Sequence, residues 1–173
     1  MSVATSYKIT LVGNDEVGVS FDSHHVNEFA SIKTIMEDMP TDNLSVPVSF
    51  ASKTLLLLKE LLTLKDTTGI PFKQSSEIKS YRGIETKVPT YSGINDPWNS
   101  TPASGIYYDK LTKIPVEDLC ATFAAADYLG CDDILHGVAY VLIQYMFNYT
   151  GDVRKHLSAH SRTILAKIHI ANI

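Results

Sequence analysis

Two pairs of histidines come nearest to metal-ligand chemistry in this sequence. His156 and His160 lie four positions apart, a spacing that places two imidazoles on one helix face and can hold zinc. Leu157 stands where a metalloprotease helix carries its glutamate, and no third ligand is evident in the sequence. The pattern therefore favours a solvated helix face. His24 and His25 are adjacent, and we interpret them as residues at a helix start that share no metal.

The other candidate catalytic groups have simpler structural interpretations. Gly13 and Gly18 are followed neither by Gly-Lys-Ser/Thr nor by a spaced glycine triplet, so they form no phosphate-binding loop. The acidic pairs at residues 37–38 and 132–133 are placed as charges at helix ends rather than as a catalytic carboxylate pair. The sequence thus predicts no catalytic residue, no metal ligand and no cofactor, and we expect a protein that is not an enzyme.

The two cysteines, Cys120 and Cys131, lie in apolar stretches with helical spacing. Neither has neighbours at the intervals typical of a metal site. A free cysteine in such surroundings behaves as a small apolar side chain. We expect two buried free thiols.

The charge balance argues against nucleic acid as the main partner. The chain has 15 Lys and Arg against 19 Asp and Glu, whereas duplex binding usually requires an excess of cations. Residues 1–12 contain one lysine and no long apolar segment, so they do not form a signal peptide. The longest nearly uncharged run, residues 137–150, is too short to cross a bilayer. We expect a cytoplasmic, nuclear or virus-associated protein that binds neither nucleic acid nor membrane.

The first fifty residues alternate between strand and helix patterns. Apolar and polar residues alternate at 7–11 and at 17–21, and the Gly-Asn-Asp-Glu sequence between them suits a turn, which predicts a hairpin. Residues 23–39 have the apolar spacing of a helix. Residues 46–50 alternate again as a third strand, and Pro47 indicates that this strand lies at a sheet edge.

The pattern then becomes helical, and afterwards irregular. Residues 51–65 form a helix with leucines around most of its circumference, which predicts burial on most sides. Residues from about 66 to 105 are rich in Thr, Ser, Gly, Pro and Tyr, and we predict a long excursion loop with at most one short strand. Its tryptophan, Trp98, either packs the loop onto the domain, which we favour, or anchors a partner.

The helical pattern resumes after Pro115, and Gly130 is placed as a helix C-terminal cap. The next helix, residues 133–147, has two apolar stripes where a surface helix needs one. Leaving a stripe in water forfeits roughly 1.5–3 kcal/mol for each Leu or Met, so either the chain's own tail or a partner protein covers it. The stripes consist of Ile134, Val138, Val141 and Tyr145, and of Leu135, Ala139, Leu142 and Met146.

Five segments, in this order, resemble the Skp and elongin C branch of the BTB/POZ proteins. Residues 31–39 are similar to the T-I-K-x-M-L-E-D segment of that family, and residues 46–48 to its V-P-L strand. Residues 107–111 stand where the family has a short W-D-x-x-F helix. Residues 125–129, Ala-Ala-Asp-Tyr-Leu, resemble the A-A-N-Y-L signature, and residues 151–157 resemble E-E-I-R-K-x-F.

The resemblance implies an α+β fold, namely a BTB/POZ (Skp-like) domain with a small three-stranded sheet flanked by helices. This domain would span residues 1–148, with the excursion loop at about 66–105, and a short C-terminal helical extension would span 149–173. Skp-type proteins bridge a cullin scaffold and an F-box substrate receptor in ubiquitin ligase complexes, which implies a protein–protein interaction adaptor.

The same resemblance implies two partner-binding surfaces. The cullin-side positions match Asp127 and Tyr128 in this sequence. The F-box-side positions match Leu135, Val138, Leu142, Val153, Leu157, Ile164 and Ile168.

Four departures from the family pattern favour a second function. Asp127 stands where Asn is usual, and Gly130 replaces an Asp. The excursion loop is not an acidic tract, and the final helix is short and apolar. The alternative is a structural or assembly subunit with a repurposed Skp-like fold, either a homo-oligomer or a component of a larger particle such as a viral one. At the level of sequence, both functions remain open.

Overall fold

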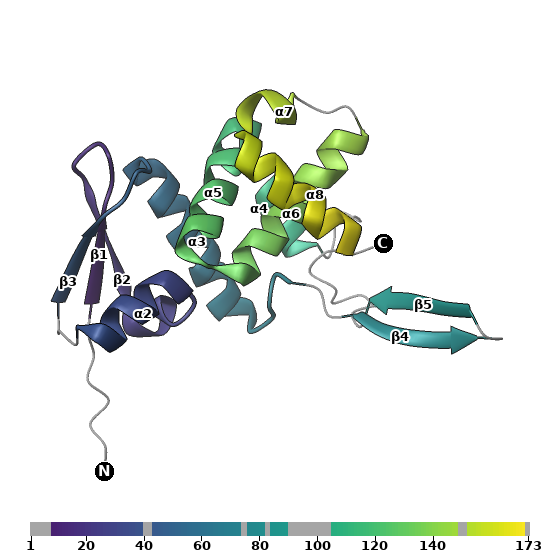
Figure 1. Cartoon of the computed structure of the whole chain (residues 1–173), viewed down its shortest axis with the longest axis horizontal. Helices are drawn as coiled ribbons and strands as arrows, with labels where there is room; N and C mark the ends of the chain where they lie inside the picture. The colour runs from purple at the N-terminus through teal and green to yellow at the C-terminus, as the bar shows by residue number, and fades with distance from the viewer. Residues whose placement is uncertain are drawn as a thin grey trace, which may run out of the picture.

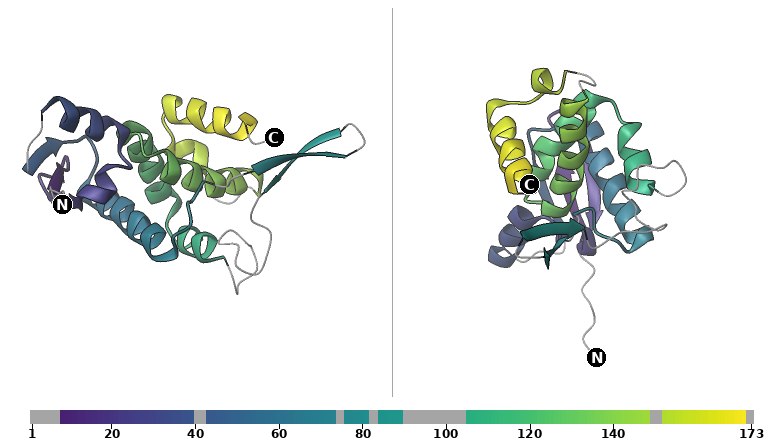
Figure 2. Two further views of the ribbon diagram at one scale, coloured as in Figure 1. Left: turned by 90° about the horizontal axis from the view of Figure 1, so that it is seen from below. Right: turned by 90° about the vertical axis from the view of Figure 1, so that its right-hand side faces the viewer.

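The computed structural model of the chain shows an α+β fold, with a small three-stranded mixed sheet at one end and a group of helices beside it (Figures 1 and 2). A two-stranded hairpin projects from the opposite end. The structure describes residues 8–39, 43–73, 76–81, 84–89, 105–148 and 152–171.

The sheet consists of β1 (Lys8–Val12), β2 (Gly18–Asp22) and β3 (Asn43–Pro47), in the order β2-β1-β3. The first two strands form the predicted antiparallel hairpin, and β3 lies parallel to β1. Apolar and polar residues alternate along β1, so one face of the strand is directed into the core. Ile9 and Leu11 on this face are fully buried.

The third strand is at the edge of the sheet, as Pro47 predicts, but it begins earlier than the alternation at residues 46–50 indicates. Pairing extends one residue further, because the Val48 N–H donates to the carbonyl of Val12 at 2.9 Å. The chain then turns away from the sheet at Phe50, whose carbonyl accepts the N–H of Asn14 at 2.9 Å.

The helix predicted at residues 23–39 is two helices, α1 (Ser23–Val26) and α2 (Ala30–Asp38). Phe29 separates them in an extended conformation, with φ −101° and ψ 92°. Its side chain is fully buried and packs edge-to-face on Phe21, with 5.2 Å between ring centroids. Burial of this aromatic ring outweighs continuation of the helix.

The helices of the second part begin with α3 (Ser52–Thr68), which runs three residues beyond the predicted end. Its leucines are not buried all round, because Leu56 is 51% exposed. The remaining helices are α4 (Ile106–Thr112), α5 (Val116–Leu129), α6 (Asp132–Phe147), α7 (Val153–His156) and α8 (Ala159–Ala171).

Helices α5 and α6 form a helical pair whose turn depends on Gly130. This residue has φ +71°, a left-handed conformation, and an added Cβ would lie 2.9 Å from the Cβ of Ala30. The two cysteines flank this region as buried free thiols, as predicted. Burial raises the pKa of Cys120 to about 11 and that of Cys131 to about 12, so both are protonated at neutral pH.

The excursion at residues 66–105 differs from the prediction of at most one short strand. It contains an antiparallel hairpin of β4 (Ser76–Tyr81) and β5 (Ile84–Pro89). No other described element packs extensively against this hairpin. Trp98 lies outside the described residues, so the structure does not decide between its two predicted roles.

The start of the excursion is fixed to the helices by Phe72, which is buried and stacks on Tyr107 with 4.0 Å between ring centroids. Gly137 gives it room, since a Cβ there would come within 2.8 Å of the Phe72 ring. Asp133 accepts the backbone N–H groups of Phe72 and Lys73 at 3.0 and 2.8 Å. The carboxylate at the start of α6 therefore holds the chain where it leaves the helices.

Candidate functional site

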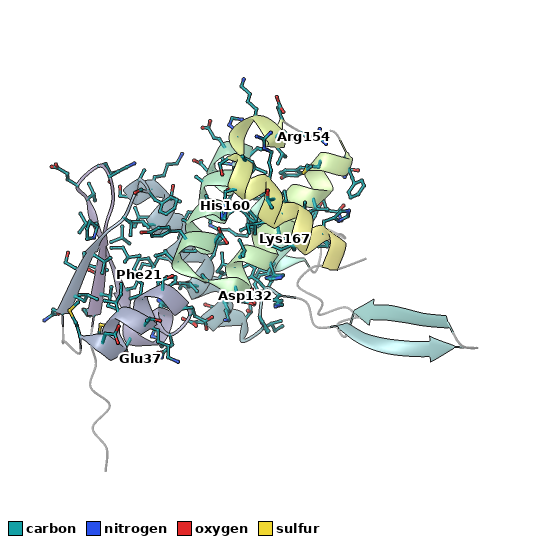
Figure 3. The ribbon with its side chains drawn as sticks, viewed as in Figure 1. Phe21, Glu37, Asp132, Arg154, His160 and Lys167 are labelled. Atoms are coloured by element: carbon teal, nitrogen blue, oxygen red, sulfur yellow. The ribbon has the colours of Figure 1, made fainter. Side chains whose placement is uncertain are left out.

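The apolar stripes of α6 are buried within this chain over most of their length. Ile134, Val138 and Leu142 are fully buried, and Leu135 is 9% exposed. Helices α5 and α8 both pack against α6, and α7 contacts α5 as well as α6 (Figures 1 and 3). The sequence left open whether the chain's own tail or a partner protein covers these stripes. In the structure, the tail helices α7 and α8 pack against α6.

The predicted F-box-side residues are brought together by the fold, but they lie mostly inside it. They come from α6, α7, α8 and the residue after α7, and all belong to the core or pack against it. A partner could contact the buried members only if α7 or α8 moved. Leu135, Val138, Leu142, Val153, Leu157 and Ile168 are buried, and Ile164 is half-buried.

The C-terminal end of α6 is the exception, because its apolar surface is not covered. Met146 is 36% exposed and Phe147 is 63% exposed, although both close the same apolar run. A groove of about 540 Å³ opens beside them, between α6, α7 and α8. Its lining residues are Ile143, Met146, Phe147, Arg154, Leu157, Arg162, Leu165, Ala166 and His169.

The groove combines apolar walls with basic side chains. Arg154 extends from α7, while Arg162 and His169 extend from α8, and none of the lining residues is acidic. The His169 ring packs edge-to-face against Phe147, with 5.3 Å between centroids. Such a surface is complementary to apolar side chains flanked by carboxylates. Sequence reasoning assigned Leu157 to a partner surface but did not single out Phe147, although it ends the longest apolar run.

The predicted cullin-side residues lie at the C-terminal end of α5. Tyr128 is 59% exposed, and its ring packs edge-to-face on Phe50 with 5.6 Å between centroids. Asp127 instead faces the tail, since its Oδ2 lies 2.8 Å from Nε2 of His160 on α8. Tyr128 is therefore exposed, whereas Asp127 pairs with His160, which Figure 3 labels on α8.

His156 and His160, the pair with zinc-like spacing, belong to no candidate metal cluster in the described part of the chain. His160 pairs with Asp127, and both histidines are exposed, but His156 ends α7 whereas His160 belongs to α8, so they do not share the one helix face that their spacing predicts. The described residues contain one group of three metal-ligand side chains, which sequence reasoning missed: His24, His25 and Asp66.

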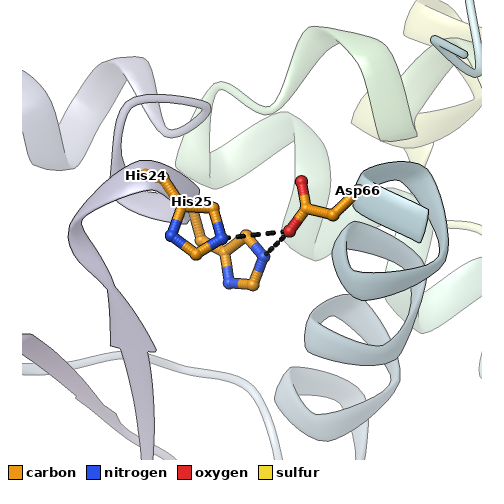
Figure 4. Close-up of side chains that lie close together, drawn as sticks. All are labelled: His24, His25 and Asp66. Atoms are coloured by element: carbon orange, nitrogen blue, oxygen red, sulfur yellow. Dashed lines mark hydrogen bonds and ion pairs between the residues drawn. The ribbon is translucent and has the colours of Figure 1, made fainter. Parts of the chain in front are cut away.

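His24 and His25 contact one common carboxylate, a convergence that the sequence analysis did not anticipate. They lie at the predicted helix start, α1, but Nε2 of His24 is 3.0 Å and Nε2 of His25 is 2.7 Å from the same oxygen, Oδ2 of Asp66 (Figure 4). Burial raises the pKa of Asp66, but the hydrogen bonds from the two imidazoles outweigh this effect and hold that pKa below its usual value. His25 is 5% exposed, so its ring is fixed by packing.

These observations define the class of protein only by architecture: an α+β chain with an uncovered apolar groove at the end of a sealed helical core. No described helix has the length and apolar character needed to cross a membrane. No protein-family model, curated protein or solved structure matches the chain.

Proposed function

We propose that this protein is a protein–protein interaction adaptor with a Skp-like BTB/POZ fold, which bridges a cullin-type scaffold and an F-box-type partner in a ubiquitin ligase complex. The order of elements supports this proposal. A hairpin, two short helices, a third strand, a long helix, a second hairpin, a short helix and then paired helices follow one another, and apart from the second hairpin this order is compatible with the resemblance. The sheet order β2-β1-β3, with β3 parallel to β1, is compatible with the same arrangement.

The observation that carries the proposal is the uncovered end of α6. Single exposed apolar residues are common on protein surfaces, but Met146 and Phe147 are adjacent and line one groove. Complete burial of a Phe side chain is worth roughly 1.5–3 kcal/mol. A partner helix that covers Phe147 would therefore gain free energy that the isolated chain leaves unused.

The basic residues of the groove favour a partner segment that carries carboxylates. Arg154 and Arg162 can form charge-assisted hydrogen bonds with carboxylates on the rim of an apolar segment. We assign the F-box-type partner to this groove. The sealed part of α6 would then support the groove from beneath rather than contact the partner.

The scaffold is assigned to the surface around Tyr128. An exposed tyrosine has a large apolar ring with a polar tip, and such residues are enriched among those that dominate binding energy at interfaces. Phe50 supports its ring from the side. Because Tyr128 lies on α5 and Phe147 at the far end of α6, the two proposed surfaces do not share a residue.

The alternative, a structural subunit that self-associates, is favoured by one observation. Most positions that match the F-box surface of the family are already buried within the chain, and α8 packs against α6. In that case Phe147 would pack against a second copy.

A pull-down with a generic cullin N-terminal fragment and an F-box peptide separates the two functions. The adaptor proposal predicts that the chain captures both, that Phe147→Asp loses the peptide and that Tyr128→Ala loses the scaffold. Val17→Asp is the matched control, because Val17 is 50% exposed and lies on neither surface. Capture of neither, together with self-association in light scattering, would contradict the adaptor proposal and favour the structural subunit.

A further inference from the structure

Three side chains from distant parts of the sequence converge at one point of the surface. His24 and His25 come from the one-turn helix α1, and Asp66 comes from the last turn of α3, more than forty positions later. Figure 4 shows both imidazoles directed at the same carboxylate oxygen. Their candidate ligand atoms all lie within 4.8 Å of one another. Two imidazoles and one carboxylate are a donor set that suits a divalent transition metal.

Nearby cations do not neutralise Asp66. The adjacent Lys65 lies 2.9 Å from a carboxylate oxygen of Glu28 and 3.3 Å from one of Asp133, so its charge is used elsewhere. Within the described part of the chain, the ion pairs of Asp66 are with the two histidines. With neutral imidazoles the cluster has a net negative charge, which attracts a dication.

The spacing requires little rearrangement to accept a metal. Tetrahedral zinc with bonds of about 2.0–2.2 Å separates its ligand atoms by about 3.3 Å. The two imidazole nitrogens now lie 3.0 and 2.7 Å from the Asp66 oxygen, so each has to move away from it by less than about an ångström. The side chains of His24 and Asp66 are 58% and 47% exposed, so they are able to move apart. The His25 side chain, 6% exposed, is the fixed member that defines the position of the ion.

The surroundings of His25 fix which of its ring nitrogens can serve as a ligand. The His25 ring is buried, and its Nδ1 has no hydrogen-bond partner among the described residues. Its Nε2 is thus the single ring nitrogen with a polar environment, and it faces the cluster. Metal-bound histidines usually donate their other N–H to an acceptor, and loss of that bond weakens affinity by roughly 10- to 100-fold. We therefore expect micromolar rather than nanomolar affinity.

We propose that His24, His25 and Asp66 form a zinc-type divalent metal site, in which water from solvent completes the tetrahedron. The ion joins α1, at the end of the sheet hairpin, to the end of α3. Its role is structural, since a bound ion stabilises the folded chain over the unfolded one. This inference does not depend on the adaptor function.

The test uses the full chain, freed of metal by a chelator, and titrates it with zinc chloride in a calorimeter. We expect one zinc per chain with micromolar affinity, and a melting temperature that rises by several degrees at saturating zinc. Cobalt(II) added to the same protein should give the visible absorption of a tetrahedral site.

Variants then locate the ion. His24→Ala and Asp66→Asn alter side chains that are 58% and 47% exposed, and each should weaken zinc binding at least tenfold while circular dichroism shows the wild-type fold. His156→Ala, which removes an exposed histidine outside the cluster, should bind as wild type does. Absence of a one-zinc isotherm in the wild type would overturn the proposal. Unchanged binding in both cluster variants would also overturn it.

Discussion

The two halves of α6 are similar in sequence and opposite in environment. From Ile134 to Leu142 its apolar side chains lie in the core, whereas Met146 and Phe147 are exposed beside a basic groove. One continuous apolar run thus builds the fold in its first half and leaves apolar side chains exposed in its second, where we propose a docking surface. Hydrophobicity alone does not separate the two, because the difference lies in how closely other parts of the chain pack against each half.

The largest expected effect comes from placing a charge in the sealed half. Leu142→Asp should destabilise the fold by more than about 4 kcal/mol, since it buries an unpaired carboxylate. Urea unfolding followed by circular dichroism measures the loss. A variant that unfolds at the wild-type urea concentration would show that this half of α6 is not part of the core.

The tail helix should matter next, because it forms the cover. Ile168→Ala is expected to cost about 2–5 kcal/mol in unfolding free energy, as for other truncations of buried side chains. Lys167→Ala, on the exposed face of the same helix, is the control and should change stability little. An equal, negligible effect of both substitutions would mean that α8 is only loosely attached.

In the uncovered half, the same type of substitution should leave the fold intact. Phe147→Asp is expected to alter the unfolding free energy by less than about 0.5 kcal/mol, as is usual for surface changes. Its affinity for an F-box peptide should fall at least tenfold, a difference of about 1.4 kcal/mol. Isothermal titration of the variant and of the wild type measures the ratio of their peptide affinities. Equal affinities would exclude the groove as the docking surface.

A smaller effect is expected from the charges at the rim. The double variant Arg154→Gln/Arg162→Gln should weaken peptide binding several-fold, mainly by slowing association, and the difference should shrink at high salt. Stopped-flow association at two salt concentrations measures it. A deficit that is independent of salt would assign these arginines a packing role instead.

The smallest effect is expected at the pair that links the tail to α5. His160→Ala removes a surface contact whose histidine side chain is 71% exposed, so it should cost less than about 1 kcal/mol. Thermal melting is sufficient to measure this. A loss comparable to that of Ile168→Ala would show that α8 is held by this polar contact and not by its apolar face.

Much of the sheet was predictable, because local patterns specify it. Alternation of apolar and polar residues predicted the hairpin β1–β2, and Pro47 predicted that β3 is an edge strand. The break between α1 and α2 was not predictable in this way. It depends on Phe29 reaching the ring of Phe21, a contact made by the fold and not by helical spacing.

The features that sequence reasoning missed have physical reasons. The β4–β5 hairpin packs extensively against no other described element, so no one-sided apolar pattern marks it. The cluster at Asp66 was missed because adjacency along a helix was taken to separate His24 from His25, whereas their rings converge on a carboxylate distant in the sequence. The α6 stripes were recognised, but their two apolar faces gave no information on which end is covered.

Hydrogen exchange with and without a bound F-box peptide distinguishes a peptide that fills the groove from one that displaces the tail. We expect added protection to be confined to the end of α6, to α7 and to α8, while the amides of the sealed half exchange as slowly as before. Faster exchange in α8 on binding would contradict this expectation, because the peptide would then displace the tail rather than fill the groove beside Phe147.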